Sequence, residues 1–136
     1  GEREKIQNLI LQDLTLISGQ KPILIKSKKS IAGFKLREGL EIAAKITLRK
    51  GRMWDFLERL IFLSLPRSRD FKGIEQKSID KGGNLNIGFR EHINFQEIFT
   101  EKEKTIFGLE ITISTNAKSR EKGLELFKLM GFPIKE

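Results

Sequence analysis

The chain has 136 residues, with 26 lysines and arginines, 18 acidic residues, one histidine and a formal net charge of +8. Because it has no cysteine, disulfides, thiolate catalysis and cysteine-ligated zinc are excluded, and no apolar run approaches the ~18 residues that span a bilayer. The first residues lack a secretory signal, which favours an intracellular protein. The length predicts one domain, 1–136, and the basic pI near 9.8 favours an anionic partner: nucleic acid first, an acidic membrane surface second.

The first predicted element is a helix over residues 2–18. Apolar residues recur at spacings of three and four and form one face, which Leu11 and Leu16 widen: Ile6, Leu9, Ile10, Leu14 and Ile17. Gly19 suits the left-handed end of a helix, and Pro22 prevents the helix from resuming.

Residues 21–52 hold all of the excess positive charge. This segment has ten basic and two acidic side chains, so the other 104 residues carry 16 of each and are neutral. Its pattern predicts a strand over 23–28, a long loop over 29–41 and a returning strand over 42–49. A solvated, lysine-rich edge hairpin would explain the charge equally well. Two features favour a polyanion-binding device: arginines with their planar forks, and an aromatic residue, Phe34, at the loop tip.

In the returning strand, apolar residues alternate with a second set of small, polar or basic residues. We expect Ile42, Ala44, Ile46 and Leu48 to face the core. The opposite face then presents Lys45, Thr47 and Arg49, which suits RNA recognised through phosphates and 2′-hydroxyls.

The rest of the chain predicts a second layer of helices and strands. A helix over 53–65, ended by Pro66, is expected to contribute core residues, which are Trp54, Leu57, Leu60 and Ile61. A polar loop over 66–84, a strand over 85–90, a helical turn over 95–99, a charged turn over 101–104 and a strand over 109–114 follow. A last helix over 120–130 is capped by Ser119 and stopped by Gly131. The order predicts an α+β fold: a mixed or antiparallel sheet with helices on one face and the other face free.

No constellation for enzyme chemistry stands out. His92 is the only histidine, and a lone histidine next to a strand is more often structural than catalytic. The glycine-rich dinucleotide and phosphate-loop motifs are absent. Asp70 and Asp80 share a loop and could be imagined as magnesium ligands, although such loop charges are usually solvated. We therefore predict no enzyme activity, no cofactor and no metal. The alternatives are an independent basic nucleic-acid-binding or membrane-surface module, and a small hydrolase using the acidic loop.

Several blocks in order and spacing resemble the bacterial-type large-subunit ribosomal protein five, the universal 5S rRNA-binding family. They are SGQKPILIKSKKSIAGFKLREG, KITLRKGRMWDFLERLIFLSLPRSRDFKG, NLNIGFREHINFQEI, GLEITISTNAKS and GFPIKE. The resemblance implies a structural role in the central protuberance of the large subunit, in a bacterial cytoplasm or an organelle (mitochondrion or plastid). The implied partners are 5S rRNA, large-subunit rRNA, peptidyl-site tRNA, small-subunit protein thirteen and other central-protuberance proteins, with no membrane.

The resemblance also implies roles for individual residues. Taken together with the basic pattern, it assigns rRNA binding to Gln20, Lys21, Lys26, Lys28, Lys45, Thr47, Arg49 and Arg52. It assigns the tRNA contact to the loop residues Gly33, Phe34, Lys35, Leu36 and Arg37. A contact with the small-subunit head is expected at Arg67, Arg69 and Asp70.

Three departures from the family pattern stand out. Relatives usually have a helix and a strand before the point that matches Gly1, so we expect either a truncated sequence or an N-terminally shortened variant of the domain. Where relatives have LRG, this chain has Leu48-Arg49-Lys50-Gly51, which affects the corner at Arg49. Where relatives have DGRGNY, residues 80–85 read DKGGNL, and the aromatic side chain is gone.

Overall fold

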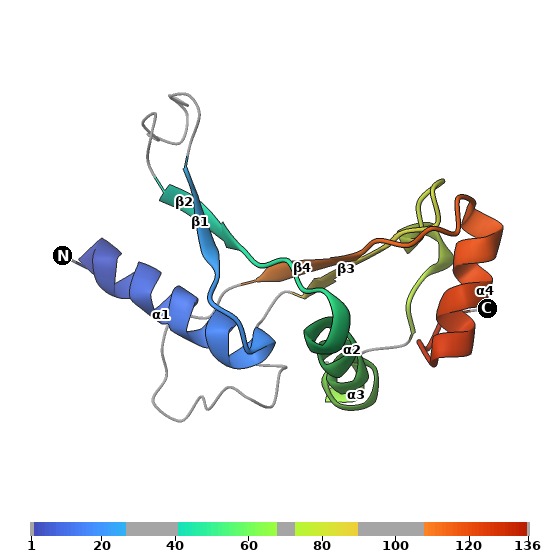
Figure 1. Ribbon diagram of the computed structural model, residues 1–136, viewed down its shortest axis with the longest axis horizontal. Helices are drawn as coiled ribbons and strands as arrows, with labels where there is room; N and C mark the ends of the chain where they lie inside the picture. Colours follow the sequence, from blue (N-terminus) through green and yellow to red (C-terminus); the bar gives the residue numbers. More distant parts are fainter. Residues whose placement is uncertain (1, 27–40, 68–72, 90–107, 136) are drawn as a thin grey trace. The chain divides into compact units, whose positions relative to one another are not determined.

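The computed structural model describes residues 2–26, 41–67, 73–89 and 108–135 (Figure 1). Contacts divide the chain into two compact units, Gly1–Phe56 and Leu57–Glu136, and each is described by itself. The single domain expected from the chain length stays a prediction. Among the residues described, no helix combines the length and the apolar character that crossing a bilayer requires.

The first unit contains helix α1 (Glu2–Ser18) and a strand pair. The bounds of α1 are those predicted, because Gly19 takes a left-handed φ of +77° and its N–H donates to the Thr15 carbonyl at 2.8 Å. Ile17 is buried as expected. Leu16 is 52% exposed, so the prediction that it widens the buried face is wrong.

The strand pair of the first unit is β1 (Ile23–Lys26) and β2 (Glu41–Lys45). The strands run antiparallel, with Ile23 opposite Lys45 and an irregularity between Ile25 and Lys26. The predicted strand and return are therefore confirmed, although β2 ends four residues before the predicted end at residue 49.

A continuous helix runs through the boundary between the two units. It comprises α2 (Lys50–Arg59), the π-helical turn η2 (Leu60–Ser64) and α3 (Leu65–Arg67). The predicted helix over 53–65 is confirmed but is longer at both ends. Pro66 lies inside the last turn and does not end the helix at its own position. The Leu65 N–H already reaches back five residues to the Leu60 carbonyl, and this wider turn leaves room for a proline ring.

The apolar band of this helix is wider than the face it buries. Leu57, Leu60 and Ile61 are buried, as predicted. Trp54 is 59% exposed, so its assignment to the core is wrong. Periodicity alone predicts which side chains share a face, but it does not say how far around the helix the neighbouring elements reach.

The second unit contains the strand pair β3 (Leu85–Phe89) and β4 (Leu109–Ile113) and the helix α4 (Arg120–Met130). The strands are antiparallel, with Ile87 opposite Ile111, and both predicted strands are confirmed. β4 ends one residue before its predicted end at residue 114, and residue 90 lies outside the described residues. The predicted caps of α4 are also confirmed: the Ser119 hydroxyl accepts a hydrogen bond from the Lys122 N–H, and Gly131 takes a φ of +104°.

Residues 73–84 contribute to the core, although the sequence predicted only a polar loop there. The segment contains the short 3-10 helix η3 (Gln76–Ser78). Ile74 and Ile79 are buried and form isolated β-bridges with Ile134 and Leu85, respectively. Single apolar residues separated by polar ones give no periodic signal, which explains why sequence reasoning missed them.

The α+β class is confirmed. The described strands form two separate antiparallel pairs, β1–β2 and β3–β4, where the sequence suggested one sheet. The predicted helical turn over 95–99, the charged turn over 101–104 and His92 lie outside the described residues.

The backbones of Gly83 and Gly123 touch inside the second unit. A Cβ added at Gly123 would lie 2.7 Å from the Gly83 Cα and 2.8 Å from its carbonyl oxygen. We therefore expect Gly123→Ala to lower the free energy of unfolding by about 1–3 kcal/mol, as overpacking does. Urea unfolding measures this. The matched control is Gly51→Ala in α2, where a Cβ meets nothing within 4 Å; equal losses in both variants would contradict the close contact.

Candidate RNA-binding site

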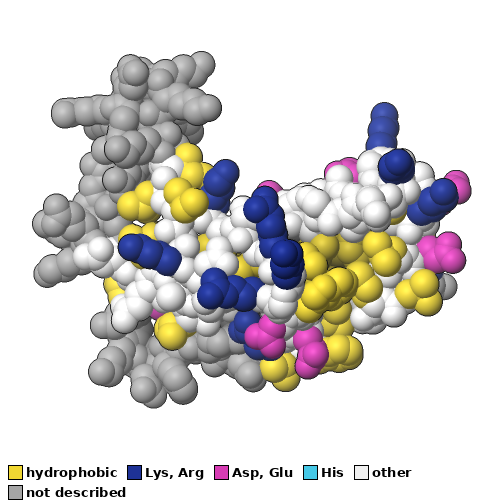
Figure 2. Space-filling model, in the orientation of Figure 1, with side chains coloured by type: hydrophobic (Ala, Val, Ile, Leu, Met, Phe, Trp, Pro, Cys, Tyr) yellow, Lys and Arg dark blue, Asp and Glu magenta, His cyan; other side chains and the backbone are white. Residues whose placement is uncertain are grey.

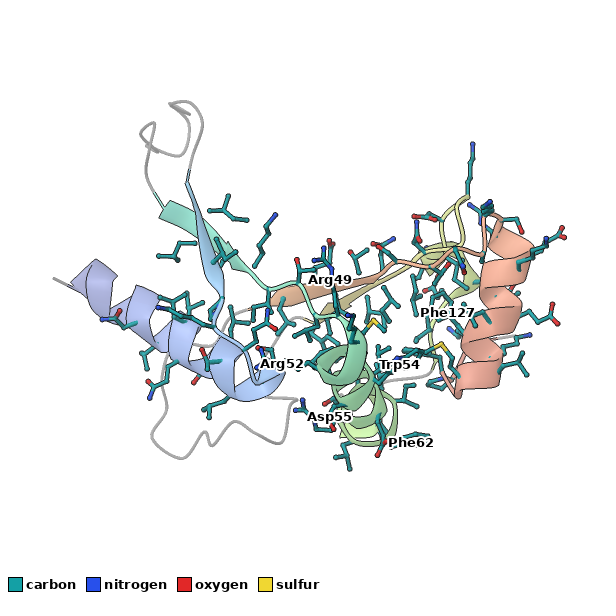
Figure 3. All side chains as sticks on the ribbon, viewed as in Figure 1. Arg49, Arg52, Trp54, Asp55, Phe62 and Phe127 are labelled. Carbon is teal, nitrogen blue, oxygen red and sulfur yellow. The ribbon has the colours of Figure 1, made fainter. Side chains whose placement is uncertain are left out.

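The exposed basic residues of the first unit follow the alternation that the sequence predicted. Lys45, Thr47 and Arg49 are exposed, whereas Ala44, Ile46 and Leu48, each of which directly precedes one of them, are partly buried. The alternation continues past the end of β2 at Lys45, so the chain stays extended up to the helix. Figure 3 shows Arg49 on this connecting segment and Arg52 in the first turn of α2.

The first turn of α2 has an unusual charge distribution for a helix start. Lys50 and Arg52 are exposed there, Arg49 directly precedes them, and the turn contains no acidic side chain. The N-terminus of a helix carries a partial positive charge, which favours anions and disfavours cations. The partial positive charge of the helix end therefore repels these cations, and the cations also repel one another. A bound anion would offset both repulsions.

Lys50 also has a strained backbone. Its φ is +54°, in the left-handed region that few residues other than glycine adopt. Lys50 lies in the run Leu48-Arg49-Lys50-Gly51, which differs from the LRG pattern that the resemblance implies. The strain places the direction change between the extended segment and α2 at Lys50 itself, and backbone strain of this kind often occurs at functional sites.

Gln20 connects the end of α1 with the segment that follows β2 and with the first turn of α2. Its side-chain Nε2 donates to the Thr47 carbonyl at 2.9 Å, and its Oε1 accepts a hydrogen bond from Arg52 Nη1 at 3.1 Å. The turn that carries Gln20 is fixed by Ser18, a buried residue whose hydroxyl accepts from the Gln20 N–H at 3.2 Å. The structure thus brings together Gln20, Thr47 and Arg52, three of the predicted site residues.

The other predicted site residues fall into two groups. Lys21, Lys45 and Arg49 are exposed on the first unit. The second group has side chains that lie outside the described residues: Lys26, Lys28, Gly33, Phe34, Lys35, Leu36, Arg37, Arg67, Arg69 and Asp70. Within the second group, the backbones of Lys26 and Arg67 are described and belong to β1 and α3.

On the face shown in Figure 2, several lysine and arginine side chains project into solvent. Their exposure fits the predicted grip on a polyanion, because phosphate contacts come mainly from exposed Lys and Arg side chains. An edge hairpin guarded by lysines would not require arginines at the start of a helix. The charge distribution at α2 therefore favours the binding interpretation.

In the described part of the chain, no three histidine, cysteine or acidic side chains are grouped as metal ligands. Asp80, one of the two residues considered for magnesium, is engaged in a turn. Its Oδ1 accepts hydrogen bonds from the backbone N–H groups of Gly82 and Asn84 at 2.9 and 3.0 Å. The hydrogen bond from the Asn84 N–H is the main cause that lowers the pKa of Asp80 below its ordinary value of 3.8.

A pKa lowered by folding makes the Asp80 carboxylate a stabilising group above pH ~4. Its contribution is lost as the pH falls from about 4 through the lower pKa of the folded state. We expect Asp80→Asn to lower the melting temperature at neutral pH, with a difference from the wild type that shrinks as the pH falls below ~4. Thermal melts across this pH range check the prediction, and a difference independent of pH would contradict it.

Two features of the site were not predicted: the strained Lys50 and the hydrogen bonds of Gln20 to Thr47 and Arg52. These bonds join residues 27 and 32 positions apart. No local pattern signals such a bond. The LRKG departure from the family was visible in the sequence, but its backbone conformation was not.

Comparison with known proteins decides the family. The model of the C-terminal part of the ribosomal protein L5 family matches residues 41–134, and the model described as "Ribosomal protein L5" matches residues 1–37. The chain belongs to the ribosomal protein L5 family. It is 53% identical over 132 residues to "Large ribosomal subunit protein uL5" of Francisella tularensis subsp. novicida, covering 97% of this chain and 74% of that protein. It is 49% identical over 135 residues to the protein of the same name in Halothermothrix orenii, covering 99% of this chain and 75% of that protein.

Membership of the L5 family makes the chain a structural, rRNA-binding constituent of the ribosome. The resemblance to ribosomal protein five is thereby confirmed. Both relatives are bacterial and support a bacterial ribosome, and they give no support to the organelle alternative.

Proposed function

We propose that this L5 family chain binds 5S rRNA through the basic surface of its first unit, and so holds that RNA in the large ribosomal subunit. The binding surface consists of Lys21, Lys45, Thr47, Arg49, Lys50 and Arg52, all of them exposed. The observation that carries the proposal is the start of α2, where cations gather at the positive end of a helix without an acidic residue in the first turn. Such an arrangement costs stability in the free protein and gains it with phosphates bound.

Recognition by this surface rests on charge and shape, with little reading of bases. The exposed groups are cations and a short hydroxyl side chain, which suit phosphate oxygens and 2′-hydroxyl groups. Residues 44–52 contain no aromatic side chain, and the exposed Trp54 lies on the other side of α2 from Arg52 (Figure 3). We accordingly expect affinity to depend strongly on salt and on the folded shape of the RNA.

The test is the binding of purified chain to 5S rRNA over a series of salt concentrations. If about six phosphates are neutralised, log affinity should fall against log salt with a slope of roughly −4 to −5. A DNA duplex of similar length serves as competitor and should compete poorly. A slope near zero, or equal competition by the duplex, would argue against the proposal, and the latter result would favour an independent nucleic-acid-binding module.

The further contacts proposed within the ribosome are with peptidyl-site tRNA, through residues 33–37, and with small-subunit protein thirteen, through Arg67, Arg69 and Asp70. The composition of residues 33–37 supports the tRNA contact, because Lys35 and Arg37 flank Leu36 and follow an aromatic residue, Phe34. Such groups suit phosphate and base contacts. Neighbouring proteins of the central protuberance and large-subunit rRNA complete the proposed set of partners.

Deleting residues 34–37 should separate the tRNA contact from the 5S rRNA contact. We expect 5S rRNA affinity to stay within about twofold, since the residues assigned to it lie elsewhere in the first unit. Binding of peptidyl-site tRNA to ribosomes containing the variant should weaken. A variant with four glycines and serines in place of these residues controls for loop length. Parallel loss of both activities would show that the loop is misassigned.

A further inference from the structure

Both ends of the Gln20 amide are occupied by groups of the same protein. The Nε2 group donates to the Thr47 carbonyl at 2.9 Å, and Oε1 accepts from Arg52 Nη1 at 3.1 Å. A backbone carbonyl can only accept and a guanidinium can only donate, so the amide fits in one orientation alone. Each end of the amide thus has one protein partner, and its second N–H and second lone pair stay available to a ligand.

Gln20 is itself held in place from the helix side. Ser18 is only 6% exposed, and its hydroxyl lies 2.7 Å from the Leu14 carbonyl and 3.0 Å from the Gln20 carbonyl while accepting from the Gln20 N–H. The end of α1 thus fixes the Gln20 backbone, and the Gln20 side chain fixes one N–H of Arg52. This chain of bonds links α1 to the first turn of α2, where Figure 3 labels Arg52.

Holding an arginine before it meets its ligand reduces the entropic cost of binding. Arg52 is an exposed residue with a long side chain, which would otherwise sample many rotamers. The single bond to Gln20 uses one of the five N–H groups of the guanidinium. Fixing a flexible side chain in its binding conformation raises affinity mainly by lowering the ordering cost.

We propose that Gln20 is a positioning residue, which serves RNA binding by orienting Arg52 toward a phosphate. This inference rests on the proposed binding of 5S rRNA by the first unit. It adds a positioning role to the direct RNA contact that the family resemblance implies for Gln20. In this role, Gln20 raises the affinity for RNA through the orientation of Arg52.

A double-mutant cycle of Gln20→Ala and Arg52→Ala tests this role, with affinity for 5S rRNA measured at one salt concentration. Gln20→Ala alone should weaken binding by about three- to tenfold, the range expected for losing the order of one long side chain. In the Arg52→Ala background, the same substitution should change affinity by a clearly smaller factor, because the positioning of Arg52 can no longer be lost. Full additivity of the two effects would overturn the proposal, because it would mean that Gln20 acts independently of Arg52.

A second cycle with Lys45→Ala separates positioning from a general loss of structure. Lys45 is exposed at the end of β2 and takes no part in the hydrogen bonds described for Gln20, so Gln20→Ala should keep its full effect in that background. Loss of the effect there too would overturn the proposal in favour of a general structural role. If the wild-type chain does not bind 5S rRNA, or binds it with an affinity that does not depend on salt, the proposed function is wrong. If the wild-type chain binds and the effects of the two substitutions are additive, only the role of Gln20 is wrong.

Discussion

Arg49→Ala is expected to weaken the binding of 5S rRNA by about 1–3 kcal/mol, the range of a charge-assisted hydrogen bond. Arg49 is exposed at the end of the extended segment, beside the strained Lys50 and the first turn of α2. Its planar fork suits a phosphate, and lysine at this position would restore the charge but not the geometry. Filter binding or calorimetry at a fixed salt concentration measures the loss, and Arg49→Lys should recover only part of it.

The matched control for Arg49→Ala is Lys81→Ala, which removes one positive charge from an exposed side chain of the second unit. We expect less than a twofold change in affinity from the control. Both variants should unfold within about 0.5 kcal/mol of the wild type, since both positions are exposed. Equal losses of affinity from the two would mean that net charge alone drives binding.

Phe127→Ala is expected to lower the free energy of unfolding by about 3–5 kcal/mol, the usual cost of emptying a buried aromatic site. Phe127 is fully buried, with an exposed fraction of 0%, and its ring meets that of Phe132 edge-to-face at 5.5 Å. The loss is a large fraction of the roughly 5–15 kcal/mol that stabilises an ordinary domain. Urea unfolding should show a strongly reduced midpoint for this variant.

Leu129→Ala, two residues further along α4, is the control for Phe127→Ala. Leu129 is 80% exposed, so its truncation should change the free energy of unfolding by no more than about 0.5 kcal/mol. Phe127→Leu should give an intermediate loss, and it provides a measurement if the alanine variant does not fold. Comparable losses at residues 127 and 129 would contradict the description of the core.

The elements predicted best from the sequence were those whose ends carry local signals. For α1, an apolar face of period 3.6 ends at Gly19, and for α4 the cap residues Ser119 and Gly131 set both limits. For β3 and β4, strict alternation predicted both strands, and the predicted end of β4 is one residue too far. In each case the residues that determine the structure are neighbours in the chain.

The misassigned residues depend on contacts between distant segments. Trp54 belongs to an apolar band, but which part of that band is covered depends on what lies against the helix. Ile74 and Ile79 are buried because Ile134 and Leu85 pair with them. Tertiary contacts of this kind decide which apolar side chains are buried, and the neighbouring sequence carries no pattern that predicts them.

In the candidate RNA-binding site too, local patterns predicted some features, whereas contacts between distant residues decided others. The exposure of Lys45, Thr47 and Arg49 could be predicted from alternation, and the concentration of charge in residues 21–52 from composition. The side-chain hydrogen bonds of Gln20 could not be predicted, because geometry across 27 and 32 residues decides them. The roles of residues in the loop over 33–37 rest on family resemblance and stay predictions.

The most direct test of RNA binding by the first unit is the RNA that the tagged chain recovers from cells. Wild-type chain should copurify with large ribosomal subunits and with 5S rRNA in equal copy number. A variant with Lys45, Arg49 and Arg52 all replaced by alanine should fold but recover little 5S rRNA. If the wild-type chain recovers none, or if the triple variant recovers as much as the wild type, the basic surface of the first unit does not bind 5S rRNA.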